Sequence, residues 1–304
     1  MTLTAGDVRR LLAEHGLRPS RALGQNFVTD ANTVRRITRL AGVGPGSRVV
    51  EIGAGLGSLT LALAETGASV TAVEVDRRLV PVLRQVVAGC PEVTVVEGDA
   101  LRVDLAALLG RDARPAPPAR PTEPAPPAEP VEPARPAGWV LVANLPYNVA
   151  TPLVVRVLEE APAVSRLLVM VQQEVGERLA AGPGDPAYGA VSVKVAYWAT
   201  ARVVGRVPPT VFIPRPNVES ALVAIERRPS PAVPADVAPY DRLFAVVGAG
   251  FAHRRKMLRR SLAGVVDPAA FAAAEVAPEA RAEELDVEQW GRLAAWGRGR
   301  TWGS

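Results

Sequence analysis

The sequence predicts an α/β protein with a doubly wound, mostly parallel sheet, followed by a smaller helical domain at its C-terminal end. Three observations predict this class. Apolar runs of strand length alternate with helix-length segments between residues 31 and 228, as in parallel strands joined by helical crossovers. A glycine-rich turn follows the first of these runs, and residues 239–304 show helical patterns alone.

The expected elements follow in chain order. Residues 1–30 begin with a short helix and continue as a polar segment. Strands are expected at 48–52, 69–75, 93–97, 139–143, 166–172, 202–207 and 221–227, and helices at 31–42, 58–66, 77–88, 150–160 and 173–181. Residues 190–200 fit either a strand or a helix, and a basic amphipathic helix is expected over 240–262. With 228–238 as a linker, the predicted domains are 1–30, 31–228 and 239–304.

A proline-rich insertion at 111–138 interrupts the α/β pattern. Its ten prolines and its lack of apolar periodicity predict a disordered or polyproline II segment. A tolerated surface loop is the favoured interpretation, because a long loop adds little closure entropy. A PxxP-type ligand for a partner is the alternative.

The composition limits the kinds of site that this chain can build. Cys90 is the only cysteine, which excludes an intrachain disulfide and a cysteine-based metal cluster. His15 and His253 are the only histidines, which disfavours a zinc site or a Ser-His-Asp triad. The formal net charge of +4 is compatible with a polyanionic partner. With no secretory signal and no apolar span of membrane length, we expect a cytoplasmic protein without a metal.

A glycine turn follows the first predicted strand of the sheet. Glu51 precedes a Gly-x-Gly-x-Gly spacing formed by Gly53, Gly55 and Gly57, and glycines let the backbone approach a ligand without a Cβ clash. The dinucleotide fingerprint needs a glycine where this chain has Ser58. A preceding Glu is typical of S-adenosylmethionine-binding turns, and a turn with a packing role alone is the simpler alternative.

Acidic residues follow the next two strands. Glu74 comes about 20 residues after the glycines, where a carboxylate can accept hydrogen bonds from both ribose hydroxyls of NAD or S-adenosylmethionine. Asp99 is placed to bind an adenine amine or to form an Asx turn. Asp76 is expected as the N-cap of the helix at 77–88.

An Asn-Leu-Pro-Tyr turn follows the strand at 139–143, at the sheet edge where α/β proteins bind ligands. Asn144 can accept a hydrogen bond from an exocyclic amine, and Tyr147 can stack on the base that carries it. Phe212, in a Phe-x-Pro-x-Pro segment, is the candidate for a second aromatic ring that stacks on the other face of the base. Stacking is worth about 1–3 kcal/mol per base; a buried core Phe is the alternative.

The densest basic stretch lies in the C-terminal domain. Its candidate phosphate contacts are Arg254, Arg255, Lys256, Arg259 and Arg260. On one continuous helix, Arg255 and Arg259 are one turn apart, as are Lys256 and Arg260. The absence of acids nearby favours phosphate contacts over a merely solvated face.

Taken together, these motifs resemble the small-subunit (16S) ribosomal RNA adenine N6-dimethyltransferase family over residues 18–262. The motifs that carry the resemblance are Leu23-Gly24-Gln25-Asn26-Phe27, Glu51 to Gly57, Glu74-Val75-Asp76, Gly98-Asp99-Ala100, Asn144 to Asn148, Gln172-Gln173-Glu174-Val175, Phe212-x-Pro-x-Pro and Arg254-Arg255-Lys256. The insertion and residues 263–304, with Trp290, Trp296 and Trp302, lie outside the family pattern.

The resemblance implies a fold of the S-adenosylmethionine-dependent methyltransferase type and assigns the site residues. Asn26 and Val28 close over the cofactor, and Gly53 and Gly55 lie along its methionine part. Glu74 binds the ribose, and Asp99 binds the adenine. Asn144 lies between the methionine end and the target amine, and Leu145, Tyr147 and Phe212 complete the catalytic set.

The implied substrate is a pair of adjacent adenosines in the 3′-terminal hairpin loop of 16S rRNA, within a late small-subunit assembly particle. Each receives two methyl groups, and we expect a monomer. Three alternatives stay open: a macrolide-resistance methylase of large-subunit rRNA, an NAD-dependent oxidoreductase, and an assembly factor that binds without methylating. Leu145 and the Phe212 segment favour the small-subunit type, and the glycine spacing disfavours the oxidoreductase.

Overall fold

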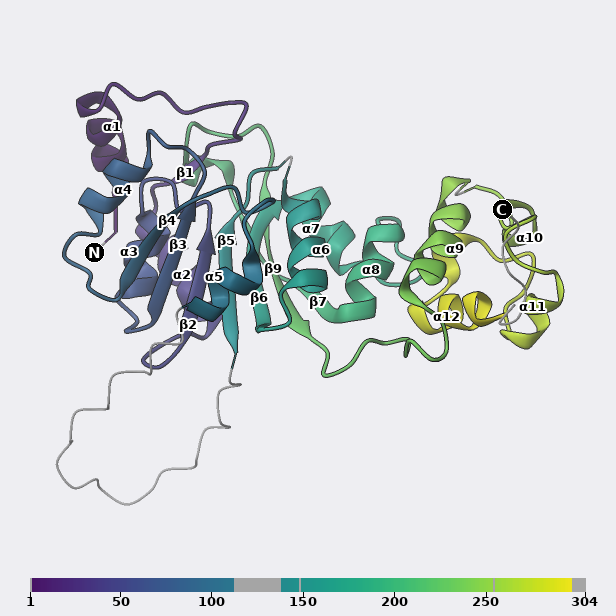
Figure 1. Ribbon diagram of the computed structural model, residues 1–304. Coiled ribbons are helices and arrows are strands. Elements are labelled where there is room, and N and C mark those ends of the chain that lie inside the picture. Colours follow the sequence, from purple (N-terminus) through teal and green to yellow (C-terminus); the bar gives the residue numbers. More distant parts are fainter. Residues whose placement is uncertain (1, 112–137, 148, 254, 297–304) are drawn as a thin grey trace, which may run out of the picture. The chain divides into compact units, whose positions relative to one another are not determined.

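The computed structural model describes residues 2–111, 138–147, 149–253 and 255–296 (Figure 1). Nearly all of the predicted insertion lies outside this set, as do Arg254 and Trp302. The chain divides into two compact units. The first comprises residues 1–146, 160–169 and 210–216, and the second comprises 147–159, 170–209 and 217–304. The predicted three-part division of the chain stays a prediction.

The predicted α/β class is confirmed. Seven strands form a sheet in the order β4-β3-β2-β5-β6-β9-β7, and β6 passes from the first unit into the second. The strands that begin in the first unit are β2 (Arg48–Ile52), β3 (Ser69–Glu74), β4 (Val93–Glu97), β5 (Trp139–Asn144) and β6 (Val164–Gln172). The pairs β2–β3, β3–β4 and β2–β5 are parallel. The apolar runs become buried strands because helices cover both faces of such a sheet.

Helices of the first unit accompany these strands (Figure 1). They are α1 (Ala5–Glu14), α2 (Ala31–Ala41), α3 (Ser58–Ala64), α4 (Val80–Val86) and α5 (Leu105–Arg111). A two-stranded antiparallel sheet joins β1 (Phe27–Val28) to β8 (Phe212–Ile213), next to the short helix η1 (Pro209–Val211). Segments 184 residues apart thereby lie side by side, since Val28 pairs with Phe212.

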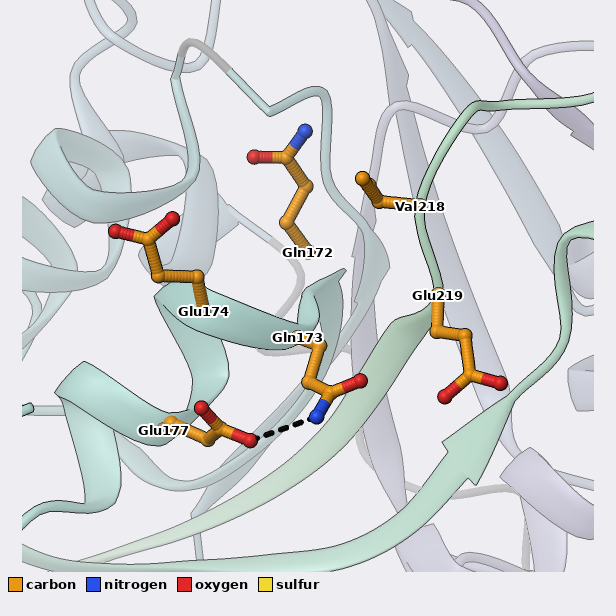
Figure 2. Close-up of a pocket in the computed structure, with 6 residues that line it drawn as sticks. All are labelled: Gln172, Gln173, Glu174, Glu177, Val218 and Glu219. Carbon is orange, nitrogen blue, oxygen red and sulfur yellow. Dashed lines mark hydrogen bonds between the residues drawn. The ribbon is translucent and has the colours of Figure 1, made fainter.

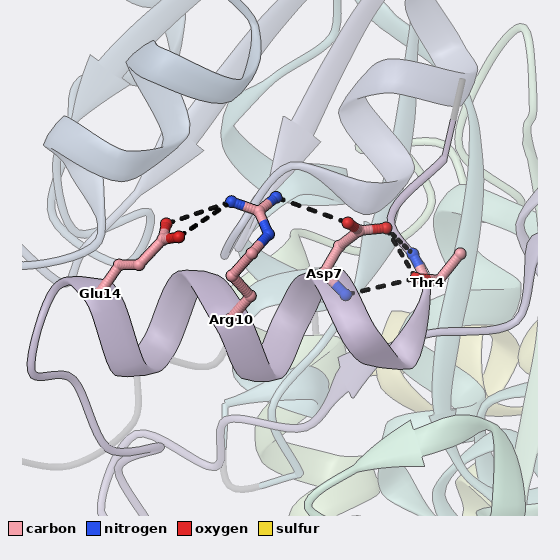
Figure 3. A network of polar contacts seen from close by, with 4 residues as sticks. All are labelled: Thr4, Asp7, Arg10 and Glu14. Carbon is pink, nitrogen blue, oxygen red and sulfur yellow. Dashed lines mark hydrogen bonds and ion pairs between the residues drawn. The ribbon is translucent and has the colours of Figure 1, made fainter.

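Polar contacts define helix α1 (Figure 3). Thr4 and Asp7 form a capping box, in which the Asp7 amide donates to Thr4 Oγ1 at 3.2 Å and the Thr4 amide donates to Asp7 Oδ2 at 3.0 Å. Arg10 then contacts both Asp7 (3.5 Å) and Glu14 (3.1 Å) along the exposed face. These contacts stabilise the start of the helix and leave its apolar face for packing.

The apolar face of α1 packs against the region of the glycine turn. Val8, Leu11 and Leu12 form one buried cluster with residues of the turn and its neighbours, namely Phe27, Leu56, Leu79 and Val82. The cluster therefore holds the N-terminal segment on the first unit.

The second unit combines helices with an antiparallel strand pair. Its strands are β7 (Ala199–Val207) and β9 (Ser220–Arg227), which run antiparallel. Its helices are α6 (Ala150–Glu160), whose last residue counts with the first unit, α7 (Gln173–Ala180), α8 (Ala190–Trp198), α9 (Tyr240–Ala252), α10 (Leu258–Ser261), α11 (Ala269–Ala273), the short η2 (Ala282–Glu284) and α12 (Val287–Ala295). Residues 190–200 are thus mainly helical. A core that includes Trp290 and Leu258, each 0% exposed, joins the C-terminal helices.

The predicted continuous basic helix over 240–262 is wrong. Helix α9 ends at Ala252, and α10 begins only at Leu258. The backbone amides of Leu258 and Arg259 instead donate to the carbonyls of Ala280 and Pro278, at 2.8 and 3.0 Å. Burial of Leu258 in the C-terminal core, together with these tertiary hydrogen bonds, interrupts the helix that the local pattern favours.

Candidate functional site

The glycine turn joins β2 to α3 and is held by the end of β3. The amide of Gly53 donates to the carbonyl of Val73 at 2.9 Å, and the amide of Gly55 donates to Glu74 Oε2 at 2.7 Å. A Cβ at Gly53 would lie 3.6 Å from the carbonyl oxygen of Asn144. The turn therefore touches both neighbouring strand ends, and the predicted site residues Gly53, Glu74 and Asn144 lie close together there.

Gly57 closes the turn at the start of α3. Its φ is +93°, and a Cβ there would lie 2.9 Å from Leu83 Cδ1. Gly55, with φ +59°, passes 3.1 Å from the ring of Phe27 by the same measure. Left-handed backbone and close packing both require glycine here, so the turn has a packing role in addition to the expected ligand role.

Glu74 is buried, with 4% of its surface exposed. Oε2 accepts from the Gly55 amide, and Oε1 accepts from the Asp76 amide at 2.8 Å. Burial raises the pKa of Glu74, and backbone hydrogen bonds from Asp76, Gly55 and Val75 oppose this effect. A carboxylate has about four acceptor positions, so beyond these backbone donors Glu74 can still accept a hydrogen bond from a ribose hydroxyl.

Glu51 carries a buried carboxyl group next to the glycine turn. The sequence alone did not predict that this group has a shifted pKa. It is 1% exposed and accepts a hydrogen bond from Thr60 Oγ1 at 2.6 Å. Burial raises the pKa of Glu51 to about 8. The group is therefore mostly protonated at neutral pH, and it links β2 to α3 on either side of the turn.

Asp99 forms the Asx turn that was the alternative to adenine binding, and its side chain remains partly accessible. Its Oδ1 accepts from the Leu101 amide at 2.9 Å, and its Oδ2 lies 3.5 Å from Arg102 Nε. The side chain is 40% exposed. A turn role and a ligand role are thus compatible at this position.

The prediction that Asp76 caps the helix at 77–88 is wrong. Helix α4 begins at Val80, with Leu79 as its N-cap. The Asp76 carboxylate accepts from the Arg78 backbone amide at 3.1 Å and from the Arg78 side chain at 3.0 and 2.8 Å. These contacts, with a hydrogen bond from Gln25, lower the pKa of Asp76 to about 2. Asp76 therefore caps the turn at 77–79, which precedes the helix: its carboxylate accepts from the Arg78 amide and its carbonyl accepts from the Leu79 amide.

The closing segment, defined as residues 18–30, lies against Asn144. Asn144 Nδ2 donates to the carbonyl oxygen of Asn26 at 3.0 Å. Val28 is buried in β1, and Thr29 donates to the carbonyl of Val211 through its amide at 2.8 Å. The structure thus brings Asn26 to Asn144 and Val28 to Phe212 within the first unit.

The remaining predicted catalytic residues differ in exposure. The side chains of Leu145 and Phe212 are 2% and 4% exposed, so Phe212 has the core position that was its alternative interpretation. Tyr147 belongs to the second unit. A stack of a base between Tyr147 and Phe212 therefore stays a prediction.

Val75 is an exposed apolar residue that the sequence interpretation passed over. Its side chain is 44% exposed between two acidic residues at the end of β3. A valine that continues a buried strand pattern gives no sign of exposure, so only the structure identifies this apolar surface beside Glu74.

Four of the five predicted phosphate-binding cations are described, all in the second unit. Arg255 and Lys256 are exposed in the connection before α10, and Arg260 is exposed on it. Arg259 pairs with Glu279 at 3.1 Å. Arg255, Lys256 and Arg260 form a cationic surface without the helical spacing that was predicted.

A cavity of about 380 Å³ opens at the start of α7 in the second unit (Figure 2). Its lining includes three carboxylates, from Glu174, Glu177 and Glu219. Gln173 points along this lining and donates to Glu177 at 2.8 Å. Such a surface repels phosphate, so we assign it no part in nucleic-acid binding.

Two further features limit the chemistry of the described residues. No group of three or more His, Cys, Asp or Glu side chains among them could hold a metal ion. Within the same ranges, no helix has the length and apolar character needed to cross a membrane.

Comparisons with known proteins agree with the motifs. A model of the ribosomal RNA adenine dimethylase family matches residues 17–297. A protein of Thermobifida fusca named ribosomal RNA small subunit methyltransferase A is 46% identical, over 96% of this chain and 95% of its own length. Its counterpart in Streptomyces coelicolor is 47% identical, over 96% of each chain.

Solved structures share the fold. The structure of ErmE, a 23S rRNA methyltransferase, matches with a TM-score of 0.64 and 26% identity, over 88% of this chain and 98% of that one. A dimethyladenosine transferase from Plasmodium falciparum matches with a TM-score of 0.65 and 20% identity, over 88% and 95% of the two chains.

Proposed function

This chain belongs to the ribosomal RNA adenine dimethylase family, and we propose that it dimethylates N6 of two adjacent adenosines in 16S rRNA, with S-adenosylmethionine as methyl donor. The observation that carries the proposal is the similarity along 96% of the chain to proteins named ribosomal RNA small subunit methyltransferase A. The site supports it, because Asn144 presents an oriented amide at the sheet edge, next to the closing segment.

The residues around the glycine turn fit S-adenosylmethionine. Gly53 is partly exposed and leaves room for the methionine part, the buried Gly55 holds Glu74 through its amide, and Glu74 keeps acceptor capacity for a ribose hydroxyl. The exposed side chain of Val75 offers an apolar surface to the adenine ring, and Asp99 offers a carboxylate to its amine. We assign the cofactor to these residues, with Asn26 and Val28 of the closing segment as its cover.

The chemistry then requires positioning more than acid or base catalysis. S-adenosylmethionine, when bound, supplies a methyl group that its sulfonium already activates. The Asn144 amide nitrogen donates to Asn26, so Oδ1 is the atom that accepts from the target amine. A backbone carbonyl near Leu145 accepts the second N–H. These two acceptors direct the nitrogen lone pair at the methyl carbon, and orientation of this kind supplies most of the rate enhancement.

The target base has to leave its stack to reach Asn144. We propose that an aromatic ring stacks on the extruded adenine, with Tyr147 and Phe212 as the two candidates. Each transfer costs the amine one proton, which passes to water, so a single N–H remains after the first and the monomethylated base rotates or rebinds before the second.

Within 16S rRNA, we propose the 3′-terminal hairpin loop of a late small-subunit assembly particle as the substrate. The exposed cations Arg255, Lys256 and Arg260 suit its phosphates. We expect the chain to act as a monomer in the cytoplasm.

Methyl transfer from labelled S-adenosylmethionine tests this proposal when unmethylated small subunits and large-subunit rRNA are offered in parallel. We expect label in the small subunit alone. Label in large-subunit rRNA would move the chain to the class of ErmE, to which it is 26% identical. Label in neither would favour an assembly factor that binds without methylating.

A further inference from the structure

We propose that Gln25 is a positioning residue, which ties the closing segment to the strand end that carries Glu74 and thereby sets the affinity for the cofactor. The proposal rests on the proposed function, because it concerns the S-adenosylmethionine site. Gln25 belongs to the motif that begins at Leu23, in which the sequence interpretation gave a role to its neighbour Asn26 alone.

The side-chain amide of Gln25 makes two hydrogen bonds in opposite directions. Oε1 accepts from the Ser20 amide at 2.7 Å, and Nε2 donates to Asp76 Oδ2 at 2.9 Å. Only one orientation of the amide satisfies both partners, because a backbone N–H needs an acceptor and a carboxylate needs a donor. The second bond joins positions 51 residues apart in the chain.

The bond to Ser20 closes a compact turn ahead of Asn26. The Gln25 amide donates to the Ser20 carbonyl at 3.1 Å, and the Leu23 amide donates to Ser20 Oγ at 3.3 Å. The side chain of Gln25 therefore shapes the same turn that its Nε2 fastens to Asp76. Asn26, which receives the Asn144 hydrogen bond, is the next residue along the chain.

The bond to Asp76 continues to the glycine turn. The Asp76 amide donates to Glu74 Oε1 at 2.8 Å, and Glu74 Oε2 accepts from the Gly55 amide at 2.7 Å. One connected series thus runs from Ser20 through Gln25, Asp76 and Glu74 to Gly55. A segment fastened in this way loses less conformational freedom when it closes over a ligand, which raises affinity.

Two substitutions separate the two bonds of Gln25. Gln25→Met keeps the length of the side chain and removes both bonds. Gln25→Glu keeps the acceptor for Ser20 but places a carboxylate opposite Asp76, whose pKa of about 2 keeps it ionised. We expect the dissociation constant for S-adenosylmethionine to rise about tenfold with Gln25→Met and further with Gln25→Glu, since hydrogen bonds to charged groups are among the stronger ones. At saturating cofactor, we expect kcat to change less than about twofold.

Arg78→Gln is the matched control. Arg78 contacts the same carboxylate as Gln25, at 3.0 and 2.8 Å, but its side chain is 58% exposed. We expect its substitution to change cofactor affinity less than about twofold, because the bond from Gln25 remains. In a double-mutant cycle, Gln25→Met should add little to the effect of Asp76→Ala, because both remove the same link.

Calorimetry of S-adenosylmethionine binding, with hydrogen exchange of residues 18–30, tests the proposal. Weaker binding with faster exchange in this segment, and an unchanged melting temperature, would support a positioning role. Equal affinity of the wild type and Gln25→Met would overturn it, whereas a wild type that binds no S-adenosylmethionine would overturn the proposed function instead. If the variants fail to fold, the wild type still decides: the Ser20 amide should gain protection on cofactor binding, and no gain contradicts the proposal.

Discussion

Asn144 is oriented by its surroundings before any substrate arrives. Its side-chain nitrogen donates a hydrogen bond to the carbonyl of Asn26. Its side-chain oxygen is therefore the atom that can accept a hydrogen bond from the target amine. The closing segment therefore does two things, because it covers the cofactor site and fixes the rotamer of the residue that receives the target amine.

We predict that Asn144→Ala removes methyl transfer and leaves particle binding intact. Loss of an oriented polar group at a reacting centre typically costs about 10²–10³ in kcat. Single-turnover methylation and sedimentation with small subunits measure the two properties separately. Loss of both would count against the assignment of Asn144 to the chemical step.

A second prediction concerns the buried Glu51, whose pKa is raised from 4.5 to about 8. The folded state holds this proton more tightly than the unfolded state, so its contribution to stability is full below pH 4.5 and is lost as pH rises towards 8. The slope reaches at most about 1.4 kcal/mol per pH unit.

Glu51→Gln keeps an acceptor for Thr60 and cannot ionise. Relative to the wild type, the variant should therefore gain stability between pH 5 and pH 8. Urea unfolding of both proteins across this range measures the difference. Parallel stability curves would show that Glu51 does not titrate as expected.

At the scale of elements, the glycine turn depends on how closely α3 approaches α4. We predict that Gly57→Ala lowers the free energy of unfolding by about 2–4 kcal/mol, from left-handed strain and overpacking. Gly46→Ala is the matched control, because its φ of +81° carries similar strain, yet no atom lies within 4 Å of the added Cβ. Denaturant unfolding of both variants should show the larger loss of unfolding free energy for Gly57→Ala. Equal losses would mean that the Leu83 side chain moves away from the added Cβ at no cost.

Several elements could be predicted from sequence because their determinants are local. The strands at 48–52 and 93–97 match the structure since their apolar runs end at glycines and acids. The helix over 240–262 could not be predicted correctly, because the carbonyls that interrupt it, at Ala280 and Pro278, come from a later segment. The role of Gln25 could not be predicted either, because its partner Asp76 lies 51 residues later in the chain, beyond the end of β3.

On the scale of the whole molecule, the cofactor site and the cationic surface belong to different units. The cofactor residues lie in the first unit, and the exposed cations before and on α10 lie in the second. We predict that Lys256→Gln weakens binding to small subunits and reduces the salt dependence of log K by about 0.7–0.9, the contribution of one phosphate contact.

Binding titrations at several salt concentrations measure that slope. Arg84→Gln, an exposed cation at the end of α4, should leave it unchanged. An equal change of the slope in both variants would indicate that net charge alone determines binding, and would contradict a specific phosphate contact near α10.

The central claim is adenine dimethylation by the Asn144 site, and nucleoside mass analysis of treated small subunits tests it most directly. After incubation with S-adenosylmethionine, the wild type should form N6,N6-dimethyladenosine at two adjacent positions of the 3′-terminal hairpin, and Asn144→Ala should form it at least about a hundredfold more slowly. The claim would be contradicted by an absence of this nucleoside with the wild type, or by its formation with Asn144→Ala at the wild-type rate.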